Sequence, residues 1–203
     1  MQEPAFTPSD SLQLIEEMIQ KAQGRFSDNG HLYLLWGWVI LLCSSTSFVL
    51  VHFFHSFTWL NAVWMLTLPT MVYQMIYLAR HRNKKRVKTY TDEINNFVWV
   101  VFVIMGFLTG VVVGRSGHPE LLNPMILVLY GMPTFLSGVI LRFLPLRIGA
   151  LSCWALALLA VFLPVSYSFL LIALAVIAAW IVPGYLLRSQ FKQQESHAGT
   201  THL

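Results

Sequence analysis

Residues 97–114 read FVWVVFVIMGFLTGVVVG, and this stretch decides the fold class because it runs without a single charged side chain. A helix needs about 20 mostly apolar residues to cross a hydrocarbon core of roughly 30 Å. Across the chain of 203 residues, 56% are hydrophobic and only 11% are charged, whereas about a quarter of the residues in an average soluble domain are charged. Composition and this stretch together predict an all-α protein whose helices cross a membrane.

Five other apolar runs lie before and after residues 97–114, so we expect a polytopic membrane bundle of six transmembrane helices. Asn123 and Pro124 suit the N-cap and the first position of the helix that follows them. The fifth run is short for a complete crossing. The expected spans lie at residues 32–54, 59–79, 97–114, 123–141, 148–163 and 168–187.

The chain divides into three parts under this interpretation. A transmembrane domain at residues 31–188 is preceded by a cytoplasmic amphipathic helix within residues 1–30 and followed by a short cytoplasmic tail at 189–203. Glu16 and Glu17 on the polar face of that first helix weaken the case for a membrane-surface helix. The alternatives are that it packs under its own spans or that it holds a cytosolic or membrane protein partner. Behind capping side chains, its apolar residues recur at three- and four-residue steps: Leu12, Ile15, Ile19, Ala22 and Phe26.

The orientation follows from Lys and Arg residues, which favour the cytoplasmic side of a membrane. All of them except Arg115 fall on one side of the six expected spans, so we expect both termini in the cytoplasm. The same cations would contact anionic lipid head groups. This role explains the basic run after the second span without a nucleic-acid partner, which we do not expect. The run consists of Arg80, Arg82, Lys84, Lys85, Arg86 and Lys88.

Three glycines in the opening stretch carry the clearest packing signal. Gly106, Gly110 and Gly114 recur every four residues and predict a flat face along one helix, which lets another backbone approach closely. This face packs either against the chain's own bundle or against another subunit of a homo-oligomer.

Intramembrane polar residues normally reveal function, because charge within hydrocarbon is costly. No Asp or Glu lies within any expected span, which counts against ion-coupled transport by carboxylates. Hydroxyl groups can bond back to their own helix, and Pro133 is either an ordinary kink or a break that exposes backbone groups to a ligand. The residues that could line a polar pathway are Ser44, Ser45, Ser47, Thr67, Gln74, Pro133 and Ser137.

Histidines are the remaining candidates for chemistry. His52 and His55 are three residues apart, so on one helix they would share a face and could reach one metal ion. His118 belongs to a separate loop. Interfacial histidines with no special role are the alternative, and we expect no cofactor.

Three short stretches carry a resemblance that covers most of the chain: SLQLI at residues 11–15, LWGW at 35–38 and PGY at 183–185. On these residues the chain is similar to uncharacterised small multi-pass proteins of bacteria. The resemblance implies a location in the inner (plasma) membrane and no activity.

The sequence leaves two main hypotheses about function, of which it favours the first. The first is a passive transporter or channel-like bundle for a small solute, which requires a polar cavity that reaches the middle of the membrane. The second is a membrane-embedded scaffold or regulator that holds a partner through its N-terminal amphipathic helix. An intramembrane enzyme ranks last, because no acid–base pair, activated nucleophile or complete metal shell can be assembled at one membrane depth.

Overall fold

The computed structural model describes residues 30–55, 58–82 and 90–189, and all regular structure in these ranges is helical. The predicted amphipathic helix, most of the tail and the cations from Lys84 to Lys88 lie outside the described residues. The described elements are α2 (Gly30–His52), α3 (Leu60–Trp64), α4 (Thr67–Arg82), α5 (Tyr90–Ser116), η2 (Pro119–Leu121), α6 (Leu122–Ile140), α7 (Leu144–Phe162), α8 (Val165–Val176) and η3 (Ile177–Ile181).

Six helical stretches in the described residues are long and apolar enough to cross a membrane, as the sequence predicts. The fifth is longer than expected, because α7 begins at Leu144 and places Pro145 in its first turn. A proline costs little there, since the first N–H groups of a helix have no intrahelical partner. The sixth stretch, Val165–Ser189, contains α8, the π-helical turn η3 and the helical residues that follow.

The second span is interrupted rather than continuous. It consists of α3 and α4, which are separated by Met65 and Leu66. Pro69 therefore lies in the first turn of α4 and not in the middle of a helix. The break precedes the proline because a proline is tolerated at the start of a helix but not in its interior.

The predicted N-cap of the fourth span is wrong. The 3₁₀ turn η2 leads directly into α6, and the residue that precedes α6 makes no side-chain cap. Asn123 lies inside the helix instead, where its amide Nδ2 donates a 2.7 Å hydrogen bond to the Ser168 hydroxyl. The Asn123 side chain, which was expected to cap its own helix, therefore joins α6 to α8 instead.

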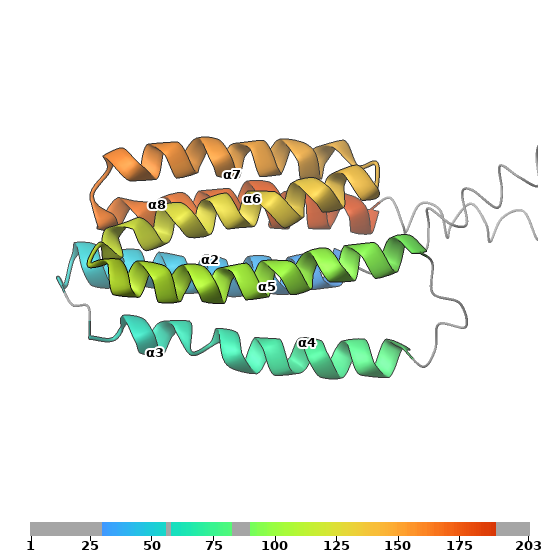
Figure 1. Cartoon of the computed structure of the whole chain (residues 1–203), viewed down its shortest axis with the longest axis horizontal. Helices are drawn as coiled ribbons and strands as arrows, with labels where there is room; N and C mark the ends of the chain where they lie inside the picture. The colour runs from blue at the N-terminus through green and yellow to red at the C-terminus, as the bar shows by residue number, and fades with distance from the viewer. Residues whose placement is uncertain (1–29, 56–57, 83–89, 190–203) are drawn as a thin grey trace, which may run out of the picture.

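The helices form a bundle whose centre is the last span (Figure 1). α2, α6 and α7 surround α8 and η3, while α5 packs mainly against α6 and α3–α4 pack against α2. Leu127, Leu146, Ile172 and Val176 are among the fully buried side chains of this core. The first residues of α2 and the end of the last span lie at the same end of the bundle (Figure 1).

Candidate functional site

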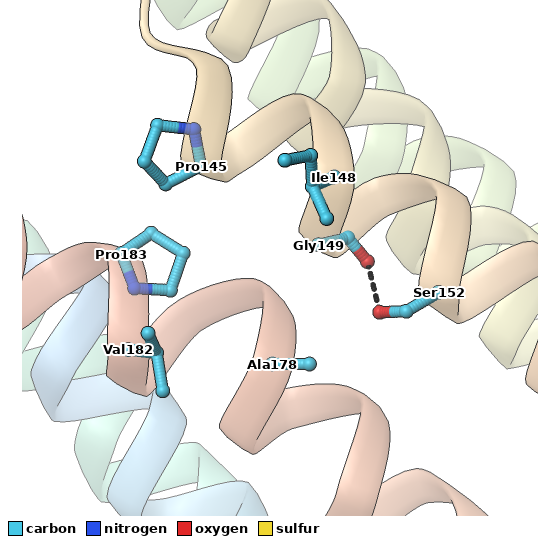
Figure 2. Close-up of a pocket in the computed structure, with 7 residues that line it drawn as sticks. All are labelled: Pro145, Ile148, Gly149, Ser152, Ala178, Val182 and Pro183. Atoms are coloured by element: carbon cyan, nitrogen blue, oxygen red, sulfur yellow. Dashed lines mark hydrogen bonds between the residues drawn. The ribbon is translucent and has the colours of Figure 1, made fainter.

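The last span departs from regular α-helical geometry at η3. The Val182 N–H bonds to the carbonyl of Ile177, five residues earlier. The next residue in this pattern is Pro183, which has no N–H to offer the Ala178 carbonyl. Turns of π-helix within α-helices often occur at functional sites. The irregular turn therefore marks the region between α7 and the last span as a candidate site (Figure 2).

Two glycines let neighbouring helices approach η3 closely. A Cβ at Gly149 of α7 would lie 2.6 Å from Ala179 Cα and 2.7 Å from the Ala178 oxygen. The Gly149 backbone thus lies against the carbonyl to which Pro183 offers no N–H, an approach typical of weak Cα–H···O contacts. From α2, a Cβ at Gly37 would lie 2.8 Å from Ile181 Cγ1.

A cluster of aromatic side chains joins η3 to α2, α5 and α6. The Trp180 and Tyr130 ring centroids are 4.8 Å apart, and Trp99 lies 6.1 Å from Trp180 and 5.9 Å from Tyr33. Trp180 Nε1 donates a 2.9 Å hydrogen bond to the Thr134 hydroxyl, which itself donates to the Tyr130 carbonyl. The indole N–H is therefore satisfied inside the bundle, as a buried tryptophan requires.

A second buried polar contact fixes α5 to α6. The Ser137 hydroxyl donates a 2.7 Å hydrogen bond to Asn95 Oδ1, and both side chains are buried. The Tyr33 hydroxyl is also buried, near the Ser137 and Trp99 side chains, and has no hydrogen-bond partner among the described residues. The sequence predicts a role for Ser137 but not for Asn95, although an Asn near the start of an apolar helix is a signal that could have identified it.

The other predicted pathway residues are mostly bonded to their own helices. Ser44 and Ser47 are fully buried, and each hydroxyl donates to the carbonyl four residues earlier at 2.7 Å. Thr67 donates to the Trp64 carbonyl, whereas Ser45 is exposed. Gln74 Oε1 accepts a 2.5 Å hydrogen bond from the Trp36 indole, which joins α4 to α2. The polar pathway stays a prediction.

Pro133 lies within α6, where α7 supports the surrounding backbone. The Trp154 indole donates a 3.1 Å hydrogen bond to the Val128 carbonyl. Gly131 makes room for this ring, because a Cβ there would collide with Trp154 Nε1. Pro133 also lines a groove of about 260 Å³ between α5 and α6, and its other lining residues are apolar.

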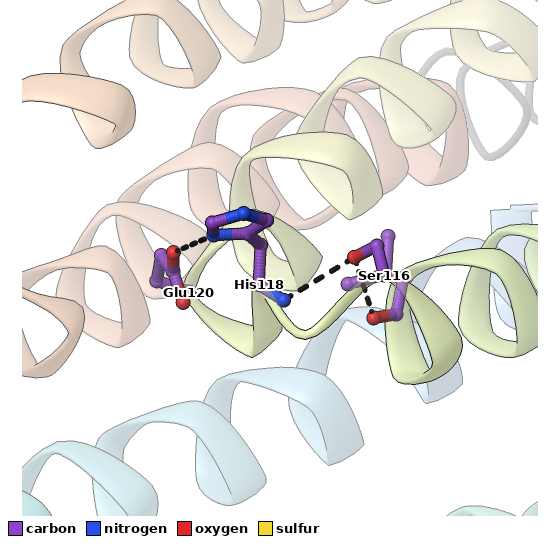
Figure 3. A network of polar contacts seen from close by, with 4 residues as sticks. Ser116, His118 and Glu120 are labelled. Carbon is purple, nitrogen blue, oxygen red and sulfur yellow. Dashed lines mark hydrogen bonds and ion pairs between the residues drawn. The ribbon is translucent and has the colours of Figure 1, made fainter.

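The histidine candidates are not brought together on one helix. α2 ends at His52, and His55 follows with a left-handed backbone (φ 50°), so the expectation of a shared helix face is wrong. His52 stacks on Phe48 at 5.1 Å. In the α5–α6 connection, His118 Nδ1 pairs with Glu120 at 2.9 Å (Figure 3). Residues 30–55, 58–82 and 90–189 contain no group of three or more His, Cys, Asp or Glu that could hold a metal.

The predicted glycine face of α5 lies open. Within the described chain, a Cβ at Gly106, Gly110 or Gly114 would meet nothing within 4 Å. Of the two alternatives for this face, packing within the chain's own bundle is not seen among the described residues. Of the basic run that was expected to contact lipid, Arg80 is exposed at the end of α4.

Comparisons with known proteins identify no relative. No protein-family model, no curated protein and no solved structure matches this chain.

Proposed function

We propose that the chain is an integral protein of the bacterial inner membrane that acts as a scaffold by holding the transmembrane helix of a partner protein along α5. Its six spans leave both termini in the cytoplasm, as the distribution of Lys and Arg favours. The predicted amphipathic helix within residues 1–30 would supply the cytoplasmic part of the same contact.

The open face of α5 is the observation that carries this proposal. Of the 18 most apolar consecutive residues of Ile94–Ser116, only 6% are buried, although this helix is among the most hydrophobic in the described chain. Gly106, Gly110 and Gly114 lie on it, and a Cβ added to any of them would have no neighbour within 4 Å among the described residues. Glycines at this spacing promote association of transmembrane helices, because lipid provides no hydrophobic drive and close backbone contact must replace it.

The internal polar groups support a scaffold over a passive transporter for a small solute. Ser44, Ser47 and Thr67 donate to their own helix, and the Ser137 hydroxyl is bonded to Asn95. Hydroxyls engaged in this way offer few free groups to a solute that must exchange its water for protein contacts. Transport remains the competing hypothesis.

A photo-crosslinking experiment tests the partner helix. Phe107 is 72% exposed and lies one turn from Gly110 on the same side of α5, so benzoylphenylalanine at position 107 preserves the shape of the site. In native membranes we expect a protein adduct. Gly110→Leu should abolish the adduct by filling the flat face, whereas Val112→Leu, at a position that is 65% exposed on a different side, should retain it.

The outcome distinguishes the occupants of this face. Lipid adducts alone, or equal crosslinking in Gly110→Leu and Val112→Leu, would overturn the scaffold proposal. An adduct at twice the mass of this 23.1 kDa chain would identify the bound helix as a second copy and contradict a partner protein.

Topology requires a separate test in a chain without Cys43 and Cys153. Single cysteines at Lys84 and Gln193 should be protected from an impermeant thiol reagent in right-side-out vesicles, and a cysteine at His118 should react. Labelling of the first two from opposite faces would contradict the six-span arrangement.

A further inference from the structure

A second surface feature is formed by helices other than α5. An open groove of about 360 Å³ runs between α7 and the last span (Figure 2). Ile148 and Val182 form its exposed rims at 59% and 48% exposure. Its lining residues are Pro145, Ile148, Gly149, Ser152, Ala178, Val182 and Pro183.

The groove is apolar, because Ser152 is the one polar side chain that lines it and its hydroxyl is already hydrogen-bonded. The Ser152 hydroxyl donates a 2.6 Å hydrogen bond to the Gly149 carbonyl, as Figure 2 shows. Small residues at Gly149, Ser152 and Ala178 leave the space that larger side chains would fill. An elongated hydrocarbon chain suits such a surface, since it needs no hydrogen bonds.

Three arginines lie close in sequence to Pro145 and Pro183, which line the groove. Arg142 precedes α7, Arg147 lies in its first turn, and Arg188 follows Pro183 by little more than one helical turn. The sequence contains no Asp or Glu between Leu121 and Ser189, and none of these arginines forms an ion pair within the described residues. Arg147 Nε donates to the Gly138 carbonyl at 3.0 Å, whereas Arg142 and Arg188 are exposed.

We propose that this region binds an anionic phospholipid, with one acyl chain in the groove and the phosphate among the arginines. An apolar groove with arginines close in sequence to two of its lining residues matches the acyl chain and the charged head group of that molecule. Basic pockets between transmembrane helices on the cytoplasmic side bind such head groups. The proposal rests on the membrane placement proposed above and is independent of the partner helix.

Native mass spectrometry of the purified full chain tests the site. The probes are phosphatidylglycerol and phosphatidylcholine with identical acyl chains, and we expect adducts of the anionic lipid to survive preferentially. Ser152→Leu should remove the adduct by filling the groove. Ser45→Leu places the same change on an exposed residue of α2 and should leave the adduct intact.

Charge variants test the head group. Arg142→Gln with Arg188→Gln should weaken binding of phosphatidylglycerol about thirty-fold, which corresponds to roughly 1 kcal/mol for each cation near the head group. Arg80→Gln with Arg82→Gln removes two cations from α4 and should have little effect. If the two pairs of arginine substitutions weaken phosphatidylglycerol binding equally, the lipid is attracted by general positive charge and the proposed site is overturned. Equal retention of phosphatidylglycerol and phosphatidylcholine by the unmodified chain would also overturn it.

Folding is checked in parallel by the thermal unfolding midpoint of each variant in detergent. If Ser152→Leu lowers that midpoint, Val182→Phe fills the same groove from its exposed rim, and unchanged phosphatidylglycerol binding in this variant overturns the proposal. Failure of the membrane placement would appear separately, in the labelling at Lys84, His118 and Gln193.

Discussion

α5 and the last span have nearly the same hydrophobicity but opposite surroundings. They are the two most hydrophobic of the six candidate spans. Of the 18 most apolar consecutive residues, however, 61% are buried in Val165–Ser189 and only 6% in Ile94–Ser116. Ala173, Ala175 and Ala179 of the last span are almost completely buried. Hydrophobicity therefore marks both helices as candidate spans but does not indicate which one the others surround.

Shape and hydrogen bonding explain this difference. Lipid is as apolar as the side chains, so helices within a bilayer associate through close packing and polar contacts. The last span has both, since Gly149 and Gly37 bring two helices against η3 and Trp180 bonds to Thr134. α5 has the bond from Ser137 to Asn95 and an open glycine face.

The largest expected effect comes from adding one methyl group to the packed glycine of α7, with an open glycine of α5 as the comparison. Gly149→Ala would force its Cβ to within 2.6 Å of Ala179 Cα, and we expect a loss of about 2 kcal/mol or more in unfolding free energy from overpacking. Gly110→Ala, with nothing within 4 Å, should gain about 0.5 kcal/mol because alanine favours a helix. Reversible unfolding in SDS–detergent mixtures measures both, and equal effects would show that the two glycines have similar surroundings.

A slightly smaller effect is expected at the aromatic cluster. Trp180→Phe keeps a ring but removes the donor to Thr134, so unfolding should become easier by about 1–2 kcal/mol. Trp38→Phe is the control, because Trp38 is 46% exposed. If the two substitutions lower the free energy of unfolding equally, the indole hydrogen bond does not hold the last span in place.

The contact that holds α5 should have a modest effect. Ser137→Ala removes the hydrogen bond to Asn95 and should cost about 1 kcal/mol. Ser44→Ala, whose hydroxyl bonds to its own helix, should change unfolding by less than about 0.5 kcal/mol. The same two variants in liposomes test transport, since altered solute flux in Ser44→Ala would favour the pathway hypothesis.

The smallest effect is expected at Tyr33. Its hydroxyl is buried and has no hydrogen-bond partner within residues 30–55, 58–82 and 90–189, so Tyr33→Phe removes a group that makes no favourable bond there. We expect unchanged stability or a gain of up to about 1 kcal/mol. A clear loss of stability in the same unfolding assay would show that the hydroxyl has a partner in the folded protein.

Sequence alone determined the all-α fold class and the approximate positions of the six candidate spans. Length and hydrophobicity set both, because a helix that crosses hydrocarbon needs about 20 apolar residues wherever it lies in the bundle. The bounds differ from the prediction mainly at helix starts: α5 begins at Tyr90 and α7 at Leu144. Polar or charged residues in these first turns hide the helix from a hydrophobicity criterion.

Only the tertiary structure decided which residues make contact between helices. The regular spacing of Gly106, Gly110 and Gly114 predicts a packing face, but the glycines that contact neighbouring helices are isolated ones such as Gly149 and Gly131. Contact between helices depends on what the opposite helix presents, here the π-helical turn of the last span and the ring of Trp154. Those partners are distant in sequence, and local spacing contains no information about them.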